Sequence, residues 1–184
     1  MSMADIKIQN IVASTTIAET LELNRIMESL PNTSYRPNIF PGLVLRIDKP
    51  KTAFLLFKSG KVVCTGAKNI EDIKKSMGKV CDMLKKVGFK VIDNPKINVQ
   101  NIVASGDLHG ELNLVSTALA VGLENTEYEP EIFPGIVYRM REMGVVLLLF
   151  SSGKIVCTGA RKPEQVSKAV EKLKEELEGK GLLY

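Results

Sequence analysis

Polar side chains that could contact nucleic acid occur twice in this 184-residue chain, in the same order and at nearly the same spacing. Each half carries an asparagine in one apolar stretch, an arginine in another, and a Ser-Gly-Lys turn. The pairs are Asn10 and Asn101, Arg46 and Arg139, Ser59 and Ser152, and Lys61 and Lys154. Cations and hydroxyls suit phosphate oxygens, whereas amides suit the edges of bases. A doubled set of this kind indicates a ligand with two similar ends.

Residues that could support catalysis do not form a comparable pattern. His109 is the single histidine and has no counterpart in the first half. The letters "SSGK" at 151–154 lack both the glycine five residues earlier and the following Ser or Thr of a phosphate-binding loop. No Cys/His cluster has zinc spacing, and the cysteines are not patterned with His109 as a thiol catalyst would be. We therefore expect no enzyme, no catalytic residue, no metal and no cofactor.

Three sequence blocks recur and define the organisation of the chain. The second copy follows the first at an offset of 91 residues in the first block and 93 in the others. The blocks are 6–14 with 97–105, 35–47 with 128–140, and 55–68 with 148–161. Two copies are too few and too long for a solenoid. We expect residues 1–93 and 94–184 to form two fused repeats related by an internal two-fold axis.

Each repeat has the hydrophobic pattern of a mainly antiparallel sheet with two helices. In the first repeat, strands are expected at 6–13 and near 38–47, 53–58 and 61–66. A capping-box spacing at Thr16 and Glu19 favours a short helix after the first strand. Asn69 favours the start of a second helix that ends at Gly88. In the second repeat, Pro163 would begin the corresponding helix.

The strand candidates carry more apolar surface than two helices per repeat can cover. The stretches "AFLLF" at 53–57 and "VVLLLF" at 145–150 are apolar on both faces, whereas a one-sided sheet should alternate. Four phenylalanines lie at the ends of such strands, namely Phe40, Phe57, Phe133 and Phe150. Either the second face is buried by self-association or tighter wrapping, or it is kept for a partner. An apolar face with a basic rim and central amides suits a DNA minor groove better than a small ligand.

Charge and composition are those of an ordinary globular chain with an uneven charge distribution. Residues 1–93 hold 15 Lys and Arg against 9 Asp and Glu, a net of +6, and residues 94–184 hold 10 against 12, a net of −2. This asymmetry is either chance or a preference for an anionic partner in the first half and a basic one in the second. No apolar run reaches the roughly 20 residues of a membrane span, and no signal peptide is recognisable. The three cysteines are an odd number. We expect a reduced, cytoplasmic, nucleoid-associated protein without membrane partners.

These motifs resemble the TATA-box-binding protein family in its short archaeal type. The resemblance covers nearly the whole chain and rests on the doubled "QNIVAS", the doubled "IFPG" preceded by Tyr-x-Pro, and the doubled "SGK" turn followed by "CTGA". It implies an α+β fold of two pseudo-symmetric halves. The halves would share a saddle-shaped, curved, ten-stranded antiparallel sheet with four helices on its convex side. The missing cover on the other side would then be the DNA-binding surface.

The resemblance also implies a role for each doubled residue. Phe40 with Phe57, and Phe133 with Phe150, match pairs that intercalate at the two ends of a TATA element. The positions that match the groove floor are Asn10, Asn101, Val12, Val103, Leu55, Leu148, Val63, Val156, Thr65 and Thr158. The positions that match phosphate contacts are Arg46, Arg139, Ser59, Ser152, Lys61, Lys154, Lys68 and Arg161.

The family pattern also bears on the register of the hairpin after Phe57. A two-residue turn at Ser59 and Gly60 would place Phe57 on the same face as Val62. The family instead places Phe57 on the face of Val63 and Thr65. Because a slip of one residue inverts every side chain, the residues alone leave both registers open.

The resemblance implies a general transcription factor that binds the TATA box in the minor groove and kinks it by phenylalanine insertion. Glu129 and Glu131 match acidic positions through which the family recruits transcription factor B, and RNA polymerase would follow through the assembled complex. The first-repeat equivalents are Arg36 and Asn38, so this acidity is one-sided. In the absence of DNA, a homodimer of the chain is also expected. A small-molecule carrier is the remaining alternative, although it would rarely need a symmetric set of groups.

Overall fold

The computed structural model describes residues 5–184, and these residues form ten strands and four α-helices. The strands hydrogen-bond into one sheet in the order β2-β3-β4-β5-β1-β6-β10-β9-β8-β7. This strand order is symmetric about β1 and β6, which are the first strands of the two repeats. The expected α+β class, with ten antiparallel strands and four helices, is confirmed.

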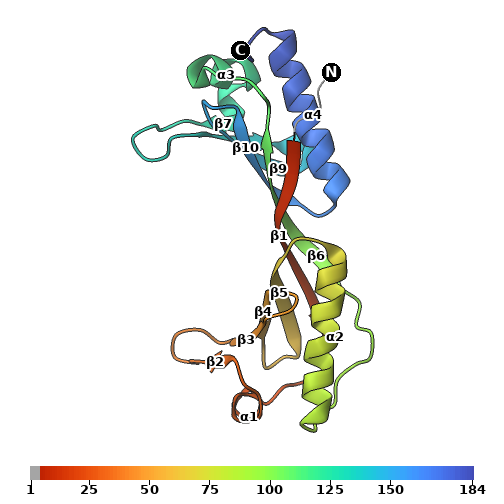
Figure 1. Ribbon diagram of the computed structural model, residues 1–184. Coiled ribbons are helices and arrows are strands. Elements are labelled where there is room, and N and C mark those ends of the chain that lie inside the picture. Colours follow the sequence, from red (N-terminus) through yellow and green to blue (C-terminus); the bar gives the residue numbers. More distant parts are fainter. Residues whose placement is uncertain (1–4) are drawn as a thin grey trace. The chain divides into compact units, whose positions relative to one another are not determined.

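The chain divides into two compact units, and the strands β1 (Asp5–Thr16) and β6 (Asn98–Asp107) each contribute to both. One unit is Asn10–Gln100, and the other is Asn101–Tyr184 together with the described residues up to Gln9. The start of β1 therefore packs with the second repeat, and the start of β6 with the first. Figure 1 shows β1 in red and β6 in green.

The unit Asn10–Gln100 contains α1 (Leu23–Ser29), β2 (Thr33–Tyr35), β3 (Leu43–Ile47), β4 (Thr52–Leu56), β5 (Lys61–Ala67) and α2 (Ile70–Lys86). The helix α2 begins as the sequence predicts, because the Asn69 side chain accepts a hydrogen bond from the Asp72 amide at 2.8 Å. Its apolar stripe, which includes Ile73 and Leu84, is buried and packs against β5. The helix ends before Gly88, whose φ is +92°.

The other unit contains α3 (Leu114–Val121), β7 (Thr126–Glu127), β8 (Ile136–Met140), β9 (Val145–Leu149), β10 (Lys154–Ala160) and α4 (Pro163–Gly179). Two short 3-10 turns, η1 (Leu123–Asn125) and η2 (Arg141–Met143), complete it. Pro163 begins α4 as predicted, and the helix packs against β10. Each long helix thus packs against the strand that precedes it in the chain.

Burial alternates along the strands and separates a covered side from an open one. In β4, Thr52, Phe54 and Leu56 are buried, whereas Ala53 and Leu55 are only half-buried. The same alternation holds in β5, β9 and β10. We term the half-buried side the open face of each unit. Its members are Asn10, Val12, Val44, Ala53, Leu55, Val63 and Thr65 in one unit, and Asn101, Val103, Val137, Val146, Leu148, Val156 and Thr158 in the other.

Two predictions about local structure were wrong. Thr16 does not cap a helix, because β1 continues through it and pairs with Lys61. The helix α1 starts later, after Glu22, which makes no side-chain cap. The strand expected near 38–47 begins only at Leu43, since residues 37–39 form a turn. The sequence analysis also missed the short strands β2 and β7 at the ends of the sheet.

Candidate nucleic-acid interface

The two asparagines of the open faces are held in one orientation by hydrogen bonds from the neighbouring strand. Asn10 Oδ1 accepts a hydrogen bond from the Gly66 amide at 2.7 Å, and its Nδ2 donates to Thr65 Oγ1 at 3.1 Å. Asn101 repeats this with the Gly159 amide at 2.7 Å and Thr158 Oγ1 at 3.2 Å. The backbone N–H of glycine fixes the side-chain oxygen on one side. The amide nitrogen has two N–H groups and donates one to the threonine, so it keeps the other for a ligand acceptor.

A β-bulge in the strand next to each asparagine orients the glycine backbone N–H that donates a hydrogen bond to the asparagine side chain. The register between β1 and β5 shifts between Ile11 and Ala13, and Gly66 has a φ of +99°. Gly159, in β10, has a φ of +95° beside the corresponding shift against β6. Residues with a Cβ rarely adopt this conformation, which explains why glycine follows threonine in both copies of "CTGA".

The predicted phenylalanine wedges form a ring pair in each unit. The ring centroids of Phe40 and Phe57 are 5.9 Å apart, and those of Phe133 and Phe150 are 5.6 Å apart, both edge to face. A Cβ at Gly42 would lie 2.6 Å from the Phe40 ring, and one at Gly135 would lie 3.0 Å from the rings of Phe133 and Phe150. The glycine of "FPG" therefore leaves room for the rings to meet.

The hairpin after Phe57 has a three-residue loop, which settles the register. Leu55 pairs with Val63, and the Phe57 amide donates to the Lys61 carbonyl at 2.9 Å. Phe57 therefore shares the open face with Leu55 and Val63, as the family pattern implied. In the second unit, Leu148 pairs with Val156 and the Phe150 amide donates to the Lys154 carbonyl at 3.1 Å.

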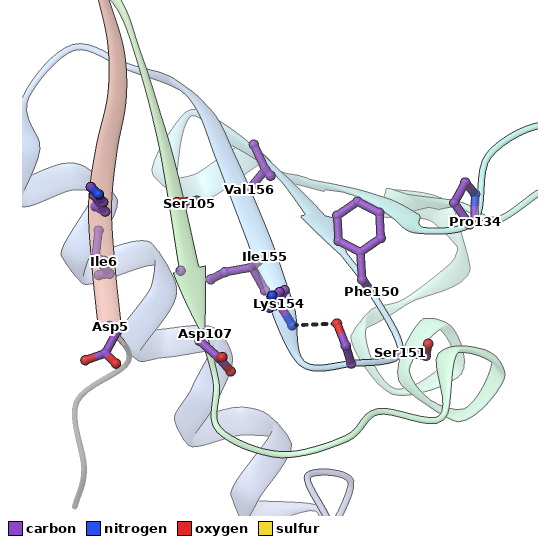
Figure 2. A pocket seen from close by; sticks show the side chains of 13 residues that line it. Asp5, Ile6, Ser105, Asp107, Pro134, Phe150, Ser151, Lys154, Ile155 and Val156 are labelled. Atoms are coloured by element: carbon purple, nitrogen blue, oxygen red, sulfur yellow. Dashed lines mark hydrogen bonds between the residues drawn. The ribbon is translucent and has the colours of Figure 1, made fainter. Parts of the chain in front are cut away.

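Polar and charged side chains flank these faces. Arg46, Arg139, Lys61, Lys154, Lys68, Arg161, Ser59 and Ser152 are all exposed. A hollow of about 700 Å³ lies beside Phe150 in the second unit and is lined by Ser152 and Lys154 among others. Figure 2 shows Phe150 and Lys154 in its wall. The Ser152 hydroxyl accepts a hydrogen bond from the Lys154 amide at 3.4 Å.

The acidic pair Glu129 and Glu131 lies in the turn that precedes Phe133. Both side chains are exposed, as is Ile132 between Glu131 and Phe133, which is 80% exposed. The Phe133 and Ile132 amides donate to the Glu129 carbonyl at 2.9 Å, which closes the turn. The turn therefore presents two carboxylates and an apolar side chain together.

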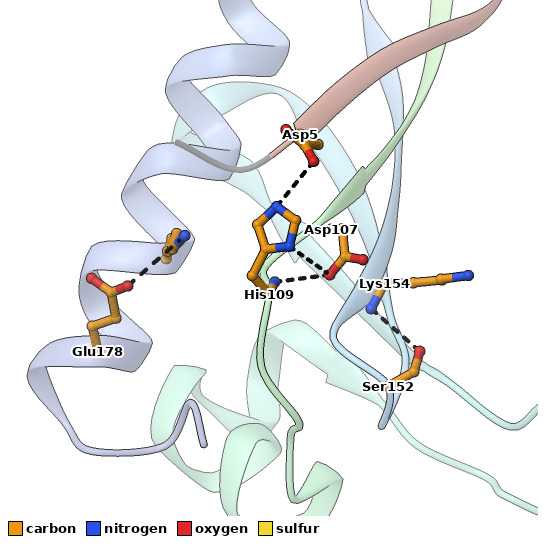
Figure 3. Close-up of polar contacts among 7 residues, drawn as sticks. Asp5, Asp107, His109, Ser152, Lys154 and Glu178 are labelled. Atoms are coloured by element: carbon orange, nitrogen blue, oxygen red, sulfur yellow. Dashed lines mark hydrogen bonds and ion pairs between the residues drawn. The ribbon is translucent and has the colours of Figure 1, made fainter. Parts of the chain in front are cut away.

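His109 joins two segments of its own unit through carboxylates. Its Nε2 lies 3.1 Å from Asp5 Oδ2, and its backbone amide donates to Asp107 Oδ1 at 2.8 Å (Figure 3). These contacts connect the start of β1 to the loop after β6. Among residues 5–184, no group of three His, Cys, Asp or Glu could hold a metal ion.

The cysteine thiols are buried on the covered side and have the character of small apolar groups. Burial raises the pKa of Cys64 to about 12 and the pKa of Cys157 to about 11. Cys81, on α2, is buried as well, and all three thiols are free. Because the thiolate is the reactive form, these side chains are poor nucleophiles at neutral pH.

Every predicted site residue lies on an open face, at its flanks, or in the turn before Phe133. Four apolar members of the open faces were not predicted from the sequence: Val44, Ala53, Val137 and Val146. The period of two along each strand could have found them, because Val44 lies two residues before Arg46 and Ala53 two before Leu55. Lys51, in the turn between β3 and β4, was not predicted either.

Within residues 5–184, no helix is both long and apolar enough to cross a membrane. The family model described as "Transcription factor TFIID (or TATA-binding protein, TBP)" matches residues 5–87 and again 96–179.

Individual relatives match along nearly their whole length. The TATA-box-binding protein of Thermoplasma acidophilum is 56% identical over 178 residues, which is 97% of each chain. That of Picrophilus torridus is 55% identical over 181 residues, or 98% of each chain. The solved structure of Methanococcus jannaschii TBP superposes with a TM-score of 0.87 at 46% identity, covering 95% of this chain and 99% of that one.

Proposed function

The chain belongs to the TATA-binding protein family of general transcription factors, and from this premise we propose that it binds TATA promoter elements in the DNA minor groove through its two open faces. One observation carries the proposal. In each unit an oriented amide donor stands among apolar side chains, with a phenylalanine pair at the end of the same face.

The oriented amides explain a preference for A·T pairs. The minor groove presents acceptors, adenine N3 and thymine O2, at A·T pairs, whereas a G·C pair adds the donor N2 of guanine. The free N–H of Asn10 or Asn101 can donate to those acceptors. A guanine amino group would bring a second donor and extra bulk against the apolar floor formed by residues such as Val63 and Val156.

The phenylalanine pairs would kink the duplex. Minor-groove binders, TATA-binding proteins among them, insert apolar side chains between base steps and so bend the DNA. Edge-to-face packing of two aromatic rings is attractive, so each pair would act as one wedge. Each unit supplies one such pair, and we infer that each pair enters the step at one end of the element.

The wedge role is tested by the bend angle. We expect Phe150→Ala to reduce bending of a duplex that carries a donor and an acceptor dye at its ends, because one wedge is removed. Phe89→Ala is the control, because it removes the same side chain from a half-buried position that contacts Arg25 and is not a member of an open face. A full bend at saturating Phe150→Ala protein would remove the wedge role from this residue.

The acidic turn before Phe133 is proposed to recruit transcription factor B and, through the assembled complex, RNA polymerase. Its two exposed carboxylates and exposed Ile132 suit a basic partner surface with an apolar centre. The equivalent turn of the first repeat carries Arg36 and Asn38, so that only one repeat offers this charge. The difference would give the assembled complex a direction.

Charge reversal separates recruitment from DNA binding. For Glu129→Arg combined with Glu131→Arg, we expect unchanged TATA affinity and lost capture of transcription factor B in a gel-shift assay. Glu171→Arg combined with Glu175→Arg makes the same charge change at exposed positions of α4, away from the turn and the open face, and serves as the control. Recruitment that survives the first pair of changes would show that the turn is not the docking surface.

A further inference from the structure

We infer that the two repeats hold DNA phosphates differently: Arg46, Lys51 and Lys68 form a three-cation phosphate site in the first repeat, and Glu127 competes with phosphate for Arg139 in the second. This inference rests on the proposed minor-groove binding. It adds Lys51 as a phosphate contact and Glu127 as a residue that limits one.

The three cations line one hollow in the unit Asn10–Gln100. The hollow has a volume of about 610 Å³ and is also lined by Thr65 and Gly66, which hold Asn10 in place. Within residues 5–184, no carboxylate lies within ion-pair distance of Arg46, Lys51 or Lys68. Asp72 is the acidic residue of the lining, and its carboxylate accepts a hydrogen bond from Asn69 Nδ2 at 3.1 Å at the start of α2. The hollow is therefore positive overall and adjoins the open face.

The second repeat places different residues at the equivalent positions. With the 93-residue offset, Lys51 corresponds to Gly144, and Ser34 corresponds to Glu127. The strand pairing supports this correspondence, because Ser34 pairs with Val44 in β3 and Glu127 pairs with Val137 in β8. The second repeat therefore lacks the Lys51 cation and gains the Glu127 carboxylate. It also has Lys162 and Gln165 where the first-repeat hollow has Asn69 and Asp72, so the two repeats differ in where their charges lie.

The added carboxylate contacts the arginine that would bind phosphate. Glu127 Oε1 lies 3.5 Å from Arg139 Nη2, and both side chains are at least half exposed. An ion pair this exposed contributes little to folding. A phosphate that approaches Arg139, however, must compete with this carboxylate and is repelled by it. The first repeat has Ser34 at the position of this glutamate, and no carboxylate of the described residues 5–184 lies within ion-pair distance of the corresponding arginine, Arg46.

Salt dependence measures this difference directly, because each phosphate neutralised by a protein cation releases counterions. One contact changes the slope of log affinity against log salt by about 0.9, which is roughly a three- to fourfold change in affinity between about 50 and 200 mM salt. The experiment is an anisotropy titration of a self-complementary TATA duplex over a series of potassium chloride concentrations, with the full chain.

We expect Lys51→Ala to make the slope shallower by about one contact, and Ser34→Glu to do the same by pairing Arg46. We expect Glu127→Ser to act in the opposite direction, with a steeper slope and tighter binding, because it frees Arg139. Glu124→Ser removes a carboxylate of the same repeat that is not paired with Arg139, and it is the control for net charge. Circular dichroism confirms that each variant is folded.

The outcomes separate this inference from the proposed function. If wild-type protein does not prefer TATA DNA, the proposed function fails. If it does prefer TATA DNA but Lys51→Ala and Ser34→Glu leave the slope unchanged, the difference in phosphate contacts is disproved. An equal gain from Glu124→Ser and Glu127→Ser would likewise disprove it, since net charge alone would then explain the effect.

Discussion

Asn10 and Asn101 show how backbone geometry assigns a chemical role to a single side chain. Each amide oxygen accepts the N–H of a bulged glycine at 2.7 Å, so the nitrogen must point toward the threonine and the open face. An asparagine without this contact could present either its oxygen or its nitrogen to a base. The bulge thus makes the residue a donor, which is the group that the A·T minor groove requires.

This role predicts the effect of a nearly isosteric change. Asn101→Asp keeps an oxygen for the Gly159 amide but replaces the free donor with a charged acceptor. We expect TATA affinity to fall roughly tenfold or more, because an unpaired acceptor costs at least 1 kcal/mol or so and the charge repels DNA. The folded state should be little affected, since the change adds a charge at a half-buried position that borders solvent.

The control makes the same chemical change at a helix cap. Asn113 accepts a hydrogen bond from the Ser116 amide at 3.0 Å at the start of α3, and aspartate caps helices equally well. Asn113→Asp should therefore leave TATA affinity unchanged in the same anisotropy assay. Equal affinity of the Asn101→Asp variant and the wild type would contradict the donor role.

At the scale of elements, the hairpins between β4 and β5 and between β9 and β10 fix which side chains reach the open face. Their loops contain Gly60 and Gly153, each with a φ of +85°. A Cβ at Gly60 would lie 1.8 Å from the Ala18 carbonyl oxygen, and one at Gly153 would lie 1.9 Å from the Gly110 carbonyl oxygen. The chain after β1 and after β6 is thus packed directly against the hairpin loop.

Because the Ala18 carbonyl lies so close to Gly60, adding one methyl group at Gly60 should cause a large loss of stability. Gly60→Ala should lower the free energy of unfolding by about 2 kcal/mol or more, because it combines an unfavourable φ with a backbone clash. Gly78→Ala is the comparison, since Gly78 lies inside α2 and nothing lies within 4 Å of its added Cβ. We expect it to raise stability by about 0.5–1 kcal/mol. Urea unfolding followed by circular dichroism measures both, and a neutral Gly60→Ala would contradict the packing described.

The hairpins also show which structural features could not be predicted from the sequence. Both long helices were predicted from their caps and apolar stripes, because those signals lie within the helix itself. The register at Phe57 could not be derived from the residues, since a turn of two or three residues fits the same letters and only the longer loop places Phe57 with Val63. Thr16 and Glu19 imitate a helix cap, but pairing of Thr16 with Lys61 outweighs that local preference.

Candidate-site residues were predictable to the extent that the repeat doubled them. The doubled letters pointed to the asparagines, phenylalanines and lysines of both units. Lys51 and Glu127 were missed because they are the positions at which the repeats differ, so that no doubling marks them. Their significance depends on contacts between strands, such as that of Glu127 with Arg139, which a single sequence does not reveal.

At the scale of the whole molecule, duplication would supply one set of DNA contacts per unit under the proposed function, and the positions at which the repeats differ would set the orientation on DNA. The open faces are nearly identical in residue type, which suits the similar ends of a TATA element. The flanks differ in charge: the first repeat has Ser34 and Lys51 where the second has Glu127 and Gly144. Recognition of the TATA element would therefore depend on residues that the two repeats share. The orientation of the protein on the element would depend on residues that differ between them.

Recognition of A·T pairs by the two open faces is tested most directly by one pair of titrations. Fluorescence anisotropy compares a TATA-containing duplex with the same duplex carrying a G·C pair at its centre, at several salt concentrations because phosphate contacts alone bind any sequence. We predict that the TATA duplex binds at least roughly tenfold more tightly at every salt concentration, since each mismatched pair typically costs about 1–3 kcal/mol. Equal affinity for the two duplexes would contradict recognition of the minor groove by Asn10 and Asn101.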